Sequence, residues 1–176
     1  MVNLFAYFFI SLISLIALSA IFTALISQKI KRSIPKFGKI TTLKDAEIHW
    51  YETGHGRPII MLHGLAGNLR NFTYALTDKL NQDFRVIALD RAGCGWSKRS
   101  RPESATLNEQ ARIISEFIKK EKIEKPLIVG HSLGGAIALT LALEHKTAIS
   151  GLALICPATQ MIDDIPDIFR FLNISN

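Results

Sequence analysis

A short apolar run enters a glycine-rich turn without a spacer, and this junction constrains the fold more than any other feature. Residues 126–129 (PLIV) indicate a buried strand, and residues 130–135 (GHSLGG) follow directly. An Ala- and Leu-rich helix is predicted from Leu133 to His145. A sharp strand-to-helix turn leaves no room for Cβ atoms beside its apex, which accounts for the flanking glycines. The pattern therefore predicts a strand, a tight turn with Ser132 at its apex, and a helix.

The rest of the chain beyond residue 39 alternates strand-like runs with helical patterns. Strands are predicted over 46–52, 58–62, 84–89 and 151–155, and helices over 71–80, 106–122 and 162–172. The unbroken apolar run at 58–62 predicts a strand buried on both faces, whereas the alternation at 46–52 predicts a half-exposed strand. Strands alternating with helices indicate an α/β fold, with a mostly parallel sheet flanked by helices on both faces.

The N-terminus is an uncharged apolar segment. From Val2 to Gln28 there is no acidic, basic or histidine residue, and the run exceeds the ~20 residues that cross a bilayer core as a helix. A buried core helix would rarely be apolar on every face for so long. A cleaved signal peptide usually has a basic n-region and about 7–15 apolar residues, although residues 17–19 (ALS) weakly resemble a cleavage site. The segment is therefore expected to be a transmembrane anchor.

The formal net charge of +6 is concentrated beside this segment. Lys29, Lys31, Arg32, Lys36 and Lys39 have no acid between them and leave 16 basic against 15 acidic residues elsewhere. A basic stretch beside an apolar helix suits anionic lipid headgroups, whereas nucleic acid would require a basic face on the folded domain. We therefore expect membrane lipid as a partner and no nucleic acid. The positive-inside rule predicts a single-pass protein whose C-terminal domain faces the cytoplasm.

These features divide the chain into three parts. They are a transmembrane anchor over 1–28, a basic juxtamembrane linker over 29–39, and an α/β domain over 40–176. Cys94 and Cys156 lack C-x-x-C spacing and a histidine-rich neighbourhood. We therefore expect two free thiols, no metal site and no cofactor.

Two more glycine-bearing loops follow predicted strands. His63, Gly64 and Leu65 come directly after the strand at 58–62, and residues 90–97 (DRAGCGWS) follow the strand at 84–89. In an α/β sheet, function lies at the carboxyl ends of the strands, where both loops fall. A backbone amide of the first loop can bind an acyl oxygen together with the amide of Leu133. The second loop is expected to be structural.

In this order, the three motifs resemble the N-terminal half of the serine α/β-hydrolase fold superfamily over residues 48–158, and the anchor with its linker resembles membrane-attached bacterial members. The resemblance implies that Ser132 is the nucleophile and that the amides of Leu65 and Leu133 form the oxyanion hole. It implies cleavage of an ester or related acyl bond of a small molecule through an acyl-enzyme. The serine at position 132 excludes branches of the family that use an aspartate nucleophile. The residues that would support these motifs are His63, Gly64, Gly130, His131 and Gly134.

The sequence departs from the superfamily after the nucleophile, where members carry the catalytic acid and then the histidine. His145 is the sole histidine beyond Ser132 and is expected more than ~15 Å away, near the end of the intervening helix. His131 should diverge from Ser132 and pack under the turn, and His63 is expected to support its own loop.

Asp163 and Asp164 lie where some families place the acid, but they fit a helix cap or lid entrance equally well. The chain is therefore expected to be a fragment that is truncated near the start of the lid. The alternative is an inert membrane-bound module that a partner completes. Later strands with an Asp turn and a histidine in an extended reading frame would favour the first hypothesis. The acyl group is left open, because lid residues begin only near Gln160.

Overall fold

The computed structural model describes residues 2–33 and 36–159, in two compact units, Met1–Phe37 and Gly38–Asn176. The helix expected over 162–172 lies outside the described residues, as do Asp163 and Asp164. The first unit is a single helix, α1 (Val2–Ser33). Its span Phe5–Lys29 is long and apolar enough to cross a membrane by length and composition.

Helix α1 continues five residues beyond Gln28, where the anchor was predicted to end. Lys and Arg are good helix formers, and cations in the last turn complement the negative end of the helix dipole. The helix ends before Pro35, and a proline disfavours helical conformation at the residue that precedes it. The helical part of the chain therefore includes the first basic residues of the predicted linker.

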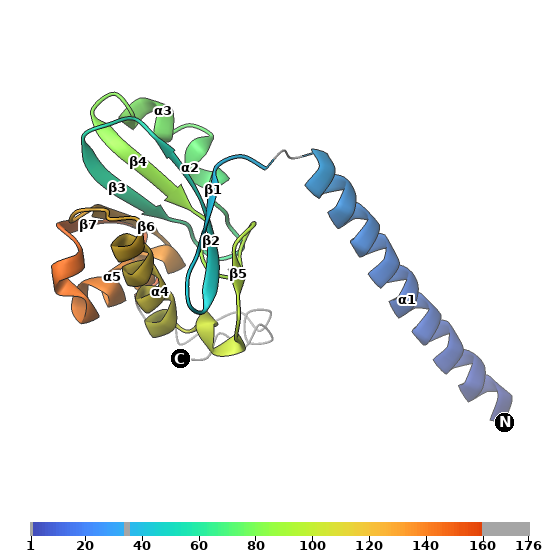
Figure 1. The fold of residues 1–176 in the computed structure, drawn as a ribbon. Helices are drawn as coiled ribbons and strands as arrows, with labels where there is room; N and C mark the ends of the chain where they lie inside the picture. The colour runs from blue at the N-terminus through green and yellow to red at the C-terminus, as the bar shows by residue number, and fades with distance from the viewer. Residues whose placement is uncertain (1, 34–35, 160–176) are drawn as a thin grey trace. The chain divides into compact units, whose positions relative to one another are not determined.

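The second unit is built on a seven-stranded sheet (Figure 1). Its strands are β1 (Lys39–Thr42), β2 (Ala46–Thr53), β3 (Arg57–Leu62), β4 (Phe84–Leu89), β5 (Lys98–Arg99), β6 (Leu127–His131) and β7 (Gly151–Ile155). Their order is β1-β2-β4-β3-β6-β7, with β5 paired to β2. Strands β4, β3, β6 and β7 are mutually parallel, and β2 lies antiparallel to β1, β4 and β5. The predicted α/β class is confirmed.

The helices of this unit are α2 (Arg70–Thr73), α3 (Thr77–Leu80), α4 (Leu107–Lys120) and α5 (Leu133–Glu144), with 3₁₀ turns at Pro102–Ala105 and Lys146–Ala148. Helices α4 and α5 lie together on one face of the sheet (Figure 1). Alternate strand residues such as Ile60 and Ile128 pack there in one core with Phe117 and Ile137. Met61, on the opposite face, is also fully buried. The central strands are thus buried on both faces, as predicted.

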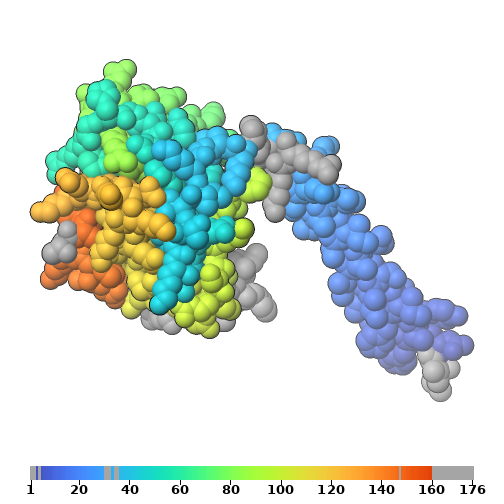
Figure 2. All heavy atoms as spheres, in the orientation of Figure 1, coloured from blue at the N-terminus to red at the C-terminus, as the bar shows by residue number. Residues whose placement is uncertain are grey.

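The β1–β2 hairpin is attached to the end of α4, and Figure 2 shows the cyan strands beside the yellow helix. Thr41 Oγ1 donates to Glu121 at 2.6 Å and accepts from Trp50 Nε1 at 2.9 Å. The Trp50 ring packs edge-on against Phe117, with centroids 5.4 Å apart. Ala46, Ile48 and Trp50 on one face of β2 are buried, whereas Glu47 and Tyr51 on the other face are partly exposed, as predicted for a half-exposed strand. His49, which is buried on that other face, is the exception. Strands β1 and β4 flank β2, and α4 covers it.

Some boundaries differ from the prediction. The helix predicted over 71–80 is divided into α2 and α3, and the β-branched Thr73 and Thr77, at which α2 ends and α3 begins, have low helix propensity. Helix α4 is two residues shorter than predicted at its C-terminus, and Thr106 caps its N-terminus by accepting a hydrogen bond from Glu109 N at 3.4 Å. Strands β4 and β7 have the predicted bounds.

Candidate functional site

Three loops leave the sheet at the same level. In the strand register, Leu62 of β3 pairs with Leu89 of β4 on one side and with Gly130 of β6 on the other. All three strands are parallel, so their carboxyl ends meet at one edge of the sheet. The residues two positions beyond this level are Arg91 after β4, Gly64 after β3 and Ser132 after β6. Strand β3 lies between the other two strands, so Gly64 lies between Arg91 and Ser132.

Ser132 stands at the junction of β6 and α5 with a strained backbone. Its φ of 52° and ψ of −120° are rare for a residue other than glycine. Its amide donates to Ile155 O, and its carbonyl accepts from Ala158 N, each at 3.0 Å. Its half-buried side chain makes no capping hydrogen bond to α5. Strand β7 and the segment that follows it thus hold the backbone of Ser132, while the Ser132 hydroxyl is not used as a cap.

Glycines allow the three backbones to approach one another. A Cβ on Gly134 would overlap the carbonyl oxygen of Leu62 and lie 2.6 Å from that of His63. A Cβ on Gly64 would lie 3.0 Å from Ser132 Cβ. Both positions therefore require glycine if α5 and the β3 loop are to meet at Ser132.

Two backbone amides around Ser132 donate no hydrogen bond to any described residue. Leu133 is the first residue of α5, where an N–H has no intrahelical acceptor and carries the positive end of the helix dipole. Leu65 follows Gly64 in the β3 loop, and its side chain is exposed. These two N–H groups are available to an acceptor that the described residues do not supply.

His63 lies fully buried beneath this loop. Its Nδ1 donates to Gly64 O at 2.8 Å, and its Nε2 accepts from Arg91 N at 3.1 Å, which fixes the neutral Nδ1–H tautomer. Burial, reinforced by the positive charge of Arg91, lowers the pKa of His63 from 6.5 to about 4. His63 is therefore neutral at pH 7 with both ring nitrogens occupied, which suits a support of the loop and not a general base.

The loop after β4 is bonded to the loop after β3. Arg91 is buried, and burial lowers the pKa of its guanidinium. Its Nε donates to His63 O at 2.9 Å, and its Nη2 donates to Gly64 O at 3.0 Å. From the sequence alone, residues 90–97 were assigned only a structural role. The signal that could have singled out Arg91 is its position, two residues past a buried strand at the functional edge of the sheet.

The other histidines are not bonded to Ser132 in the described part of the chain, which includes all five. His131 is exposed, and its Nδ1 lies 3.3 Å from where a Cβ on Gly64 would stand. The expectation that it packs under the turn was wrong, because β6 extends through His131 and directs the ring toward the β3 loop. His49 is bonded to Asp90, and His55 is exposed in the turn before β3.

His145 follows the last residue of α5, a helix of 12 residues. At 1.5 Å per residue, this helix separates His145 from Ser132 by about 18 Å. Within the described residues no group of three His, Cys, Asp or Glu side chains could hold a metal ion, and Cys94 and Cys156 form no disulfide.

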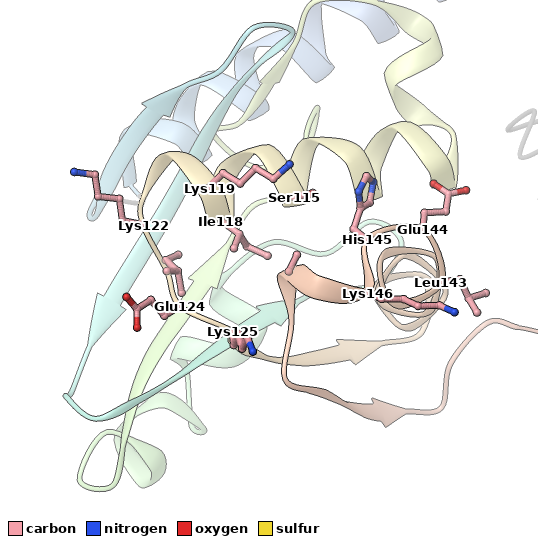
Figure 3. A pocket seen from close by; sticks show the side chains of 12 residues that line it. Ser115, Ile118, Lys119, Lys122, Glu124, Lys125, Leu143, Glu144, His145 and Lys146 are labelled. Atoms are coloured by element: carbon pink, nitrogen blue, oxygen red, sulfur yellow. The ribbon is translucent and has the colours of Figure 1, made fainter.

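A cavity of about 780 Å³ lies at the opposite end of the sheet, between the C-terminal ends of α4 and α5. Its walls include residues that precede β6, whereas Ser132 follows β6. Figure 3 shows that its lysines diverge from one another: Lys119, Lys122, Lys125 and Lys146. Ser115 Oγ and His145 Nε2 line it without a partner among the described residues. The cavity is separate from the Ser132 site and presents no converging set of charges.

The family model of the α/β hydrolase fold matches residues 57–172, and this match covers strands β3 to β7, the β3 loop and the turn at Ser132. The chain belongs to the α/β-hydrolase fold family.

Hydrolases of this fold family are among the similar proteins. A putative carbamate hydrolase, RutD, of Yersinia enterocolitica is 36% identical over 107 residues, which are 58% of this chain and 38% of the relative. Haloalkane dehalogenase 2 of Mycobacterium bovis is 32% identical over 110 residues, 61% of this chain and 37% of the relative. The esterase EaEST of Exiguobacterium antarcticum is 29% identical, with a TM-score of 0.64 over 70% of this chain and 46% of that structure.

The chain spans less than two fifths of the length of the curated α/β-hydrolase relatives that it matches. Carbamate hydrolysis and dehalogenation are different reactions within this one family. Family membership therefore does not decide which bond is cleaved, and the chemistry must be argued from the residues at the site.

Proposed function

We propose that the protein is a serine hydrolase in which Ser132 attacks an ester or related acyl bond of a small molecule. The observation that carries the proposal is the strained backbone of Ser132 at the start of α5, beside two amides that donate to no described residue. A strained nucleophile presented between a strand and a helix is the arrangement that acyl transfer uses.

In the proposed reaction, Ser132 Oγ attacks the acyl carbon while its proton passes to a general base. The carbonyl oxygen becomes an oxyanion, which accepts hydrogen bonds from Leu65 N–H and Leu133 N–H. The tetrahedral intermediate then breaks its bond to the leaving group, which takes up a proton, and an acyl-enzyme forms on Ser132. Water attacks this ester, and the acid product leaves as the serine is regenerated.

The base and its acid partner come, we propose, from protein beyond these 176 residues. Four of the five histidines of this chain are not placed to act as the base, because His63 is buried and bonded through both ring nitrogens, His49 is bonded to Asp90, and His55 and His145 belong to other parts of the fold. His131 adjoins Ser132 without a hydrogen bond to it. The greater length of the relatives is consistent with an acid and a histidine that follow later strands.

A second candidate, an inert module completed by a partner, is favoured by one observation. Among the described residues β7 pairs only with β6, and Leu154 and Ile155 on it are exposed. An apolar edge strand is a template for pairing with another chain. This candidate predicts that Ser132 stays unreactive in the chain alone.

We propose further that α1 anchors the protein in a membrane, and that the basic residues after it and the hydrolase domain are on the cytoplasmic side of that membrane. Its apolar side chains are exposed along the span. Thr23 Oγ1 donates to Ser19 O at 2.8 Å, so this hydroxyl finds a partner within the helix, as a bilayer interior requires. The basic residues after the span would contact anionic lipid headgroups.

The test uses the full chain in detergent micelles and a fluorophosphonate probe, which reacts with activated serines. We expect slow labelling at Ser132, located by mass spectrometry of peptides, because a serine without its base is a weak nucleophile. Ser132→Ala should abolish labelling, and Ser150→Ala, a change at an exposed serine before β7, should not. Equal labelling of the wild type and Ser132→Ala would overturn the proposal, and an unlabelled wild type would favour the inert module.

A further inference from the structure

We propose that Arg91 is a positioning residue: it fixes the peptide between Gly64 and Leu65 so that Leu65 N–H faces Ser132. The inference rests on the proposed function, because it assigns the origin of one oxyanion-hole donor.

The carbonyl oxygen of Gly64 accepts three hydrogen bonds. Arg91 Nη2 donates at 3.0 Å, His63 Nδ1 at 2.8 Å and Gly67 N at 3.3 Å. In a planar trans peptide, the C=O of one residue and the N–H of the next point in opposite directions. The described residues contain no cis peptide bond. Holding Gly64 O toward Arg91 therefore turns Leu65 N–H away from Arg91.

The strand order decides what lies on that other side. Arg91 follows β4, Gly64 follows β3 and Ser132 follows β6, and β3 lies between the other two strands. The direction away from Arg91 is therefore the direction of Ser132. The close approach agrees with this, because a Cβ on Gly64 would lie 3.0 Å from Ser132 Cβ. The donor and the candidate nucleophile thus share one side of the β3 loop.

A guanidinium suits this role because of its fork. Nε holds His63 O at 2.9 Å while Nη2 holds Gly64 O, so two successive carbonyls are fixed by one rigid plane. A lysine ammonium is a point charge at the end of a flexible side chain, so it cannot hold both carbonyl oxygens in the geometry that the guanidinium imposes. The charge also polarises the Gly64 peptide from behind, which strengthens Leu65 N–H as a donor.

A purely structural role accounts poorly for this arginine. Arg91 is 5% exposed, and no described carboxylate forms a salt bridge with it. A buried charge that only carbonyls solvate costs desolvation free energy that a packed apolar side chain would avoid. Gln110 also holds the loop after β4, because its Nε2 donates to Ala92 O at 3.1 Å, but it forms no hydrogen bond to Gly64. Gln110 therefore provides the matched control.

The test compares the full-length wild type, Arg91→Lys, Arg91→Met and Gln110→Ala in detergent micelles. The readouts are the fluorophosphonate labelling rate at Ser132, the Tm, and the amide resonances of Leu65 and Leu133 in ¹⁵N-leucine-labelled protein. Both Arg91 variants should slow labelling by about 10- to 100-fold, since one oxyanion donor is worth about 10²–10³ in rate. The Leu65 resonance should shift more than that of Leu133. Gln110→Ala should lower the Tm and leave the labelling rate unchanged.

Wild-type labelling kinetics and an unshifted Leu65 resonance in Arg91→Lys would overturn the inference. A measurement on the wild type keeps the test decisive if the variants unfold: a nuclear Overhauser effect between Leu65 H–N and Ser132 Hβ is expected, and its absence would also overturn it. If the wild type is not labelled at Ser132 while the Leu65 resonance still responds to Arg91→Lys, the proposed function fails and the orientation by Arg91 is supported.

Discussion

His49 Nδ1 lies 2.8 Å from Asp90 Oδ2, with the two side chains 2% and 1% exposed. The same carboxylate accepts from Leu69 N at 2.7 Å and from Trp96 N at 2.8 Å. Asp90 thereby connects strand β2, the segment that enters α2 and the loop that carries Arg91. One buried side chain beside the candidate site holds three parts of the chain that are distant in sequence.

Asp90→Asn should therefore destabilise the protein strongly. An amide retains one acceptor oxygen and places an NH₂ group against an N–H donor, which leaves buried polar groups unsatisfied. Each buried polar group left without a partner costs about 1–3 kcal/mol. This loss is measured by comparing the free energies of unfolding of the wild type and Asp90→Asn, each as the full chain in detergent. Asp83→Asn, at an exposed position, should change that free energy by no more than about 0.5 kcal/mol. Similar losses in the two variants would contradict the role of Asp90.

Gly134→Ala should disrupt the start of α5. The added methyl would overlap the backbone oxygen of Leu62, and backbone cannot move aside as a flexible side chain can. Overpacking typically costs about 1–3 kcal/mol, and a lower Tm and slower labelling of Ser132 are expected. Gly151→Ala is the control, because its methyl would meet only Leu127 Cδ1 at 3.5 Å. A variant Gly134→Ala with the wild-type Tm would show that α5 can shift from β3 without cost.

The buried His63 should make stability depend on pH. Burial, and then the Arg91 charge, lower its folded pKa to about 4 from the ordinary 6.5. Between these values the unfolded chain binds a proton that the folded chain does not. The contribution of neutral His63 to the free energy of unfolding is therefore complete above pH 6.5. It is lost as the pH falls toward 4, which lowers the free energy of unfolding by about 3 kcal/mol.

Unfolding free energies of the full chain at pH 7.5 and pH 4.5 measure this dependence. His63→Gln removes the titrating group, so its stability should fall less over the same range, although it starts from a lower value at pH 7.5. If both proteins lose the same free energy between the two pH values, His63 is not the group responsible.

Helix α1 should hold the protein in membranes by apolar burial. The chain is expected to stay in the membrane fraction after washing with sodium carbonate or high salt. Leu15→Arg places a charge within the span, at a cost of about 2.5–3.5 kcal/mol near the bilayer centre, and should release part of the protein. Leu143→Arg, at an exposed position on α5, should not. Release of the wild type by salt alone would indicate attachment through the basic residues instead.

The turn at Ser132 was predictable from the sequence because its causes are local. An apolar run, a glycine-flanked serine and an Ala-rich helix adjoin one another, and the structure has β6, Ser132 and α5 in that order. The bounds of β4 and β7 were predicted for the same reason, since each is an apolar run of strand length. Strands β1 and β5 were missed, because four- and two-residue polar strands carry no periodic pattern.

The surroundings of Ser132 depend on contacts that no local pattern encodes. Strands β4 and β6 lie on either side of β3, with Leu89, Leu62 and Gly130 at one level. This arrangement results from pairing between segments that are distant in the sequence. This pairing brings Arg91 to Gly64 and leaves His131 exposed beside the loop, against expectation. The sequence alone thus determined which residue sits at the sharp turn, and only the tertiary structure decided which side chains surround it, because strand order and register are long-range properties of the whole sheet.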